Sequence, residues 1–200
     1  GVNHALEVAR GPYCMIVNTD MYMLPGWDLA IFNQINQFHK NKIVKFTISS
    51  CLIEPTGGNP EYDIFYAGDE AKNFDEQKLL KFFSTAQPKK ANTTQYSHPI
   101  LIPKIMLEEV EYLDTAYFPG WAVDHDLPMS LYQKGCRDFV MLGNSRVYHF
   151  SSKTFKKLPD DIRNRSGQDV FENKWKISVE EFRKRLQVAQ PYDKVADGLF

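Results

Sequence analysis

The stretch Gly11–Asp20, GPYCMIVNTD, decides the fold class. Its apolar run, Tyr13–Val17, is continuous, with Gly-Pro before it and Asn-Thr-Asp after it. This pattern is typical of a strand that is buried on both faces of a parallel sheet. A short helix is expected just before it, over Asn3–Arg10, with Asn3 as the N-cap. A helix, a buried strand and a polar turn in succession predict an α/β fold.

The rest of the chain continues this alternation. The spacing of apolar residues predicts helices over 27–38, 74–83, 105–113 and 178–188. A further helix is expected to start after Asp126 and to end before Gly135. Strands are expected over 43–53, 100–102, 138–142 and 146–150. The polar stretch Thr85–His98 fits a mobile lid or an acceptor loop as well as it fits an ordinary surface loop.

Composition and charge narrow the function classes. The 200 residues are 43% hydrophobic, as in one globular domain. The net charge of −1 means that the chain has no overall positive charge with which to bind the phosphate backbone of a nucleic acid. Residues 151–200 carry 11 basic and 8 acidic side chains, so a peripheral membrane contact through this basic tail stays open. The three cysteines are far apart, which favours a reducing compartment and a cytoplasmic location. No apolar run approaches the roughly 18 residues of a membrane span, and we expect no leader peptide.

The polar turn after the first strand is the first candidate site. Asn18 and Asp20 lie two residues apart at the carboxyl end of a strand, where open α/β folds bind ligands. The Asp20 carboxylate suits a hard cation such as Mg²⁺ or Mn²⁺. An Asx turn would explain the same residues without any ligand.

Two further groups lie in the second half of the chain. Asp124 and Asp126 follow Trp121 at the start of a predicted helix, which offers a base for a hydroxyl group beside an aromatic ring that can stack on a sugar. Each aspartate taken alone could equally be a helix N-cap. His149 stands in the apolar alternation of a strand, where a histidine of the core is the ordinary interpretation.

In this order and spacing, the motifs resemble those of the family 2 glycosyltransferases, which have the GT-A fold. NHALEVARGPYCMIVNTDMYMLPGW (3–27) is similar to the helix, strand and metal-site turn of that family. LEEVEYLDTAYFPGW (107–121) and VDHDLPMSLYQKG (123–135) are similar to its acceptor side and its second acidic motif, and SRVYHFSS (145–152) to its closing strand and histidine. The resemblance implies a GT-A-like mixed sheet flanked by helices, over residues 1–152. Residues 153–200 would form a helical extension that packs on this core.

The resemblance also implies roles for single residues. Asp20 and His149 would bind a divalent cation, Mn²⁺ or Mg²⁺, with Asn18 in place of the first aspartate of the motif, and Asp124 would be the catalytic base. Four residues would bind substrate: Asn3, Asn18, Trp121 and Asp126. The reaction would move a sugar, with inversion, from a nucleotide-sugar donor to a glycan, a lipid-linked or a protein acceptor.

The family further implies two βα units ahead of Gly1, roughly 60 residues that hold the nucleoside. Two other functions stay open. The chain could be a non-catalytic module that binds carbohydrate or a nucleotide sugar. It could also be a metal-dependent hydrolase that uses Asp20, Asp124, Asp126 and His149.

Overall fold

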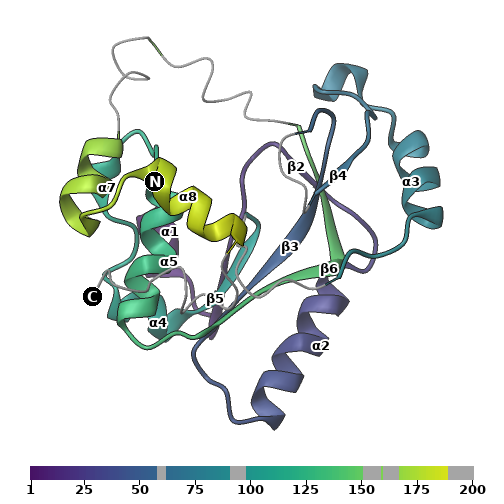
Figure 1. Ribbon diagram of the computed structural model, residues 1–200. Coiled ribbons are helices and arrows are strands. Elements are labelled where there is room, and N and C mark those ends of the chain that lie inside the picture. The colour runs from purple at the N-terminus through teal and green to yellow at the C-terminus, as the bar shows by residue number, and fades with distance from the viewer. Residues whose placement is uncertain (58–61, 91–97, 151–158, 160–166, 189–200) are drawn as a thin grey trace.

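The computed structural model describes residues 1–57, 62–90, 98–150, 159 and 167–188. One sheet lies between two groups of helices (Figure 1). The strands are β1 (Tyr13–Ile16), β2 (Met21–Met23), β3 (Phe46–Glu54), β4 (Asp63–Ile64), β5 (Ile100–Pro103) and β6 (Asp138–His149). The α-helices are α1 (Val2–Val8), α2 (Trp27–Lys40), α3 (Glu76–Thr85), α4 (Lys104–Glu109), α5 (Val123–Gln133), α7 (Gln168–Trp175) and α8 (Val179–Val188). The prediction of an α/β fold with a mixed sheet flanked by helices is confirmed.

The sheet has the order β1-β5-β3-β6-β2, and β4 pairs with β3. Strand β3 runs parallel to β6 and β4, whereas the pairs β1–β5, β3–β5 and β2–β6 are antiparallel. The long central strand β3 is buried along all but its last residue, as expected for a strand with helices on both faces, although it includes the buried polar residues Thr47, Ser49 and Ser50. Its carboxyl end, at Glu54, lies beside the carboxyl end of β6.

The strand that the sequence placed inside a parallel sheet lies at an edge. Strand β1 pairs with β5 alone and is antiparallel to it, and its residues are alternately buried and partly exposed. The prediction of a parallel strand buried on both faces was therefore wrong. The run is apolar throughout because Tyr13 and Met15 pack against the α2 side of the sheet, while Cys14 and Ile16 join the core on the other side.

The two strands expected over 138–142 and 146–150 are one strand, β6, with a shift of register. Ser50 pairs with Leu142, but the next residue of β3, Cys51, pairs with Arg146, so three residues of β6 bulge out. Ser145 anchors the bulge, because its hydroxyl group lies 2.7 Å from the Ser50 hydroxyl and donates to the Trp27 carbonyl at 3.0 Å.

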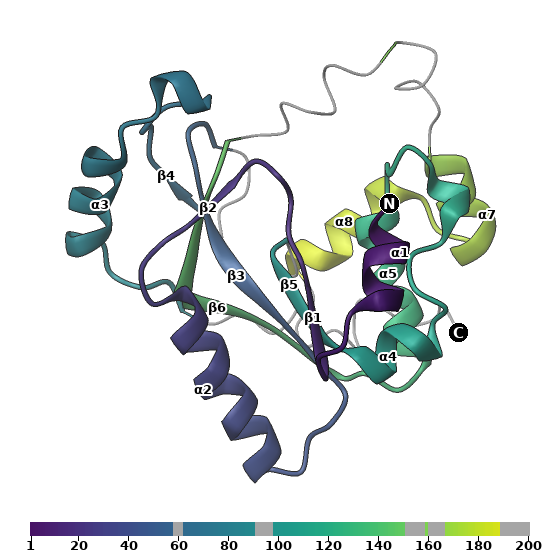
Figure 2. The ribbon, with the colours of Figure 1, turned by 180° about the vertical axis from the view of Figure 1, so that it is seen from behind.

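Three apolar clusters hold the layers together. On one face of the sheet, one cluster lies under α2 and another lies under α3. The third and largest cluster lies on the opposite face, under α1, α4, α5, α7 and α8 (Figure 2). Phe171, Trp175, Ile177 and Phe182 of the C-terminal segment are buried in this larger cluster, as the sequence predicts. The division at residue 152 stays a prediction, since residues 151–158 and the pair Lys156–Lys157 lie outside the described residues.

Several helix ends differ from prediction. Helix α5 begins at Val123 rather than after Asp126, and α4 ends at Glu109, four residues before the expected end at Leu113. Asn3 does not cap α1, because that helix has Gly1 at its N-cap. The helix predicted over 178–188 is present as α8, and the Ser178 hydroxyl accepts the Glu181 N–H as a cap.

In the described residues no helix is long and apolar enough to cross a bilayer. The three cysteines are buried, and none of them is in a disulfide bond.

Candidate functional site

The carboxyl ends of β3 and β6 bring three ionisable side chains together. Ile53 pairs with Tyr148 in parallel register, so Glu54 follows beside His149, and Met21 pairs with His149 from the other side. Glu54 Oε1 lies 2.9 Å from His149 Nδ1, and Asp20 Oδ1 lies 3.5 Å from His149 Nε2. The Phe150 N–H donates to the Asp20 carbonyl at 3.0 Å, which fixes the turn before β2. The structure thus unites Asp20 and His149, as the sequence predicts.

One ring nitrogen of this histidine is buried without a hydrogen bond. The side chain of His149 is 11% exposed, and its Nε2 atom has no hydrogen-bond partner among the described residues. The Asp20 contact is too long for a hydrogen bond. A buried polar atom without a hydrogen bond requires an explanation. An ion that binds to this atom is one such explanation.

His98 links this group to helix α5. It lies just before β5 and is partly buried. Burial lowers the pKa of His98, the negative charge of Asp124 raises it, and the positive charge of His149 lowers it. Sequence analysis missed His98, because nothing in its polar loop shows which side chains surround it.

Asp124 stands exposed in the first turn of α5. The turn before it is tight, since Ala122 adopts a left-handed φ of 67° and its carbonyl accepts the N–H groups of His125 and Asp126. Pro128 has no N–H to donate to the Asp124 carbonyl one turn earlier. A carboxylate at a helix N-terminus is favoured by the helix dipole. The exposed side chain is available to a ligand.

Asp126, two residues further, is buried and has protein partners. Its carboxylate accepts from the Tyr117 hydroxyl at 2.9 Å, from Trp175 Nε1 at 2.8 Å and from Lys174 Nζ at 3.0 Å. Burial and the Asp126 charge raise the pKa of Tyr117. Burial alone would lower the pKa of Lys174, but its bonds to Asp126 and Asp114 raise it. These contacts tie α7 to α5, while a contact of Asp126 with substrate stays a prediction.

Trp121 is partly exposed beside the same helix start. The Arg183 guanidinium lies over its ring at 5.3 Å, and Arg183 Nε donates to His125 Nε2 at 2.9 Å. The backbone of Gly167 passes so close that a Cβ there would lie 1.9 Å from the Trp121 carbonyl oxygen. Arg183 of α8 thus covers the ring, while the residue before α7 packs against the Trp121 backbone.

The two asparagines predicted to bind substrate differ in their surroundings. Asn3 donates from Nδ2 to the Leu113 carbonyl at 2.7 Å and accepts the Leu113 N–H at 3.1 Å, so it ties α1 to the segment after α4. Asn18 is exposed in the loop between β1 and β2, two residues before Asp20. Substrate contacts of both residues stay predictions.

The residues around His149 were tested as a cation site. No group of three or more His, Cys, Asp or Glu side chains in the described ranges is arranged to hold a metal ion. A Mg²⁺-type cation usually takes one or two carboxylates and completes its shell with water and substrate phosphates. Asp20 supplies one carboxylate of that smaller set, and the unpartnered His149 nitrogen would add an imidazole ligand.

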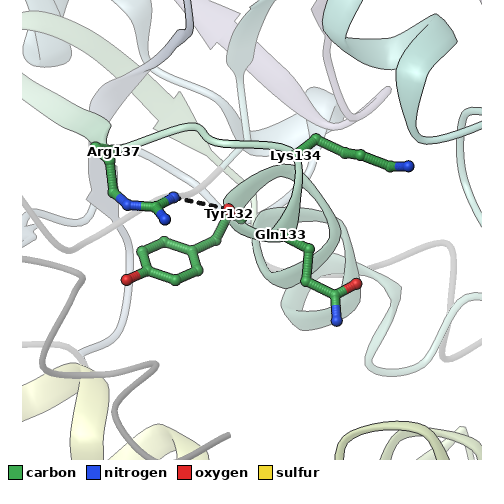
Figure 3. A pocket seen from close by; sticks show the side chains of 4 residues that line it. All are labelled: Tyr132, Gln133, Lys134 and Arg137. Atoms are coloured by element: carbon green, nitrogen blue, oxygen red, sulfur yellow. Dashed lines mark hydrogen bonds between the residues drawn. The ribbon is translucent and has the colours of Figure 1, made fainter. Parts of the chain in front are cut away.

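A hollow lies at the C-terminal end of α5. It has a volume of about 420 Å³ and is lined by Tyr132, Gln133, Lys134 and Arg137 (Figure 3). Arg137 donates to the Tyr132 carbonyl at 2.7 Å, and its guanidinium stacks on the Tyr132 ring at 3.8 Å. The side chains of Gln133 and Lys134 point away from this pair (Figure 3). An 11-residue helix is about 16 Å long, so this hollow is separate from the Asp124 end.

No protein-family model matches the sequence, and no curated protein matches it. Among solved structures, the crystal structure of residues 1–349 of S. aureus TarS, a glycosyltransferase, is similar with a TM-score of 0.46 and 13% identity. The match covers 98% of this chain and 59% of that chain. So distant a likeness concerns the fold and carries no argument about activity.

Proposed function

We propose that the protein is a glycosyltransferase that moves a sugar from a nucleoside-diphosphate donor to an acceptor hydroxyl group, with help from a divalent cation. The observation that carries the proposal is the pairing of Asp20 with the buried, unpartnered Nε2 atom of His149 at the carboxyl ends of the sheet. The position agrees with the place where open α/β sheets bind their ligands.

Asp20 and His149 would hold Mn²⁺ or Mg²⁺ together with the donor phosphates. A cation bound there supplies positive charge that stabilises the diphosphate leaving group. The chain itself contributes one carboxylate and one imidazole nitrogen, both held by backbone pairing between β2 and β6. The exposed Asn18 lies close in sequence and is free to contact the donor.

Asp124 is the base in this proposal. Its carboxylate is exposed, and its charge, like that of His149, changes the pKa of His98. In this proposal the sugar would bind between Asp124 and the cation. Asp124 would take the proton of the acceptor hydroxyl while that oxygen attacks the anomeric carbon and the diphosphate leaves on the opposite side. The configuration of the sugar is then inverted. Trp121 offers a partly exposed ring on which an acceptor sugar can stack.

A donor screen tests the proposal. The protein is incubated with Mn²⁺, a panel of nucleotide sugars and a panel of acceptors, and the products are read by mass spectrometry. Asp124→Asn should lower transfer by about 10²–10⁴, because general-base help has that value, while binding of Mn²⁺ is unchanged. Asp138→Asn, at the far end of β6, is the matched control.

Three results would contradict parts of this proposal. Normal turnover by Asp124→Asn would remove that residue from the role of base. Undiminished transfer after chelation of divalent cations would remove Asp20 and His149 from the role of cation ligands. Donor binding with neither transfer nor slow donor hydrolysis would favour the non-catalytic binding module.

A further inference from the structure

The carboxylate of Glu54 lies on the far side of the His149 ring from Asp20. We infer that Glu54 is a positioning residue that holds His149 with its proton on Nδ1, so that the lone pair of Nε2 is presented to a cation beside Asp20. The presence of a cation in this inference rests on the proposed function, whereas the contact between Glu54 and His149 is seen in the structure.

The direction of the hydrogen bond follows from the chemistry of the two groups. An ionised carboxylate can only accept, so in the 2.9 Å contact between Glu54 Oε1 and His149 Nδ1 the ring nitrogen must donate. A neutral imidazole carries one proton, and its other nitrogen is then a lone-pair donor. That nitrogen, Nε2, is the buried atom without a hydrogen bond, 3.5 Å from Asp20 Oδ1.

The fold gives Glu54 little freedom to do anything else. It is the last residue of β3, its backbone pairs with Ile64 of β4, and its carbonyl accepts the Phe65 N–H at 2.9 Å. The side chains of Glu54 and His149 are 19% and 11% exposed, so water competes weakly for their contact. Histidines that bind metals usually donate their second N–H to such a partner, and loss of the partner weakens metal binding about 10–100-fold.

The test compares three variants of the whole chain. Glu54→Leu removes the acceptor, Glu54→Gln keeps an acceptor oxygen without the charge, and Glu108→Gln changes an exposed carboxylate on α4 as the control. Two-bond ¹H–¹⁵N spectra of histidine-labelled protein at alkaline pH report which nitrogen of His149 carries the proton, with His149→Gln used for assignment. The affinity for Mn²⁺ alone is measured in parallel by the electron paramagnetic resonance signal of the free ion.

We expect the Nδ1–H pattern in the unchanged protein, in Glu54→Gln and in the control. Glu54→Leu should lose this pattern and bind Mn²⁺ about 10–100-fold more weakly, whereas Glu54→Gln stays within a few-fold of the unchanged chain. An Nε2–H pattern in the unchanged protein, or an unchanged pattern and affinity in Glu54→Leu, would overturn the inference. If the pattern depends on Glu54 but the unchanged protein binds no Mn²⁺, the positioning of the ring stands and the proposed cation site is refuted.

Discussion

Replacing Asp126 with alanine should destabilise the fold without touching the proposed base two residues away. The substitution removes the acceptor for the Tyr117 hydroxyl and for Trp175 Nε1, whose residues are 1% and 4% exposed. A buried donor left without a partner costs about 1–3 kcal/mol, so the two together should lower the free energy of unfolding by about 2–6 kcal/mol. Lys174 adds little, because its side chain is 35% exposed and keeps Asp114 at 3.1 Å.

Urea unfolding followed by tryptophan fluorescence measures this change. The midpoint should fall while the slope stays constant, since a lower midpoint at constant slope means lost stability of the same fold. Asp124→Ala is the matched control: its carboxylate is exposed, and it should change the free energy of unfolding by less than about 1 kcal/mol. A loss below about 1 kcal/mol in Asp126→Ala would refute the reading of this aspartate as the anchor of α7.

Two further predictions concern stability. The fold should become less stable as the pH falls below about 6.5, because burial lowers the pKa of His125 and the unfolded chain then binds a proton that the folded chain does not. In His125→Asn the free energy of unfolding, measured with urea, should therefore depend less on pH between pH 7.5 and 5.5. An unchanged pH dependence in this variant would contradict the prediction. Arg146→Leu should cost about 3 kcal/mol or more, because Arg146 is 2% exposed and its Nη2 atom pairs with Asp63 at 2.7 Å. The double variant with Asp63→Asn should recover part of that loss, and calorimetry showing no recovery would count against the pair.

Local patterns in the sequence were enough for the fold class and for most elements. The apolar run Tyr13–Ile16 correctly predicted a strand. However, an edge strand that packs against apolar residues on both faces has the same sequence pattern as a central parallel strand. Likewise, two short apolar segments separated by Gly143–Ser145 suggested two strands, because a bulge and a turn use the same residue types.

The candidate site was predictable where its residues follow a strand directly. Asp20 was chosen on that basis, whereas His149, inside the apolar alternation of a strand, was chosen from the family resemblance. Strand pairing brings the two together. Glu54 also ends a strand, but its partner is known only once the register of β3 against β6 is known. Two partners of Asp126, Lys174 and Trp175, come from α7, about 50 residues away, so sequence spacing could not show that the protein satisfies its carboxylate.

The central claim is that Asp20 and His149 form one half of a cation site. It is tested most directly by soaking crystals of the protein with Mn²⁺ and a nucleoside diphosphate and collecting anomalous diffraction data at the manganese edge. The account predicts an anomalous peak roughly 2.0–2.3 Å from both Asp20 Oδ1 and His149 Nε2. A peak bound to other residues, or no peak at saturating Mn²⁺, would contradict it.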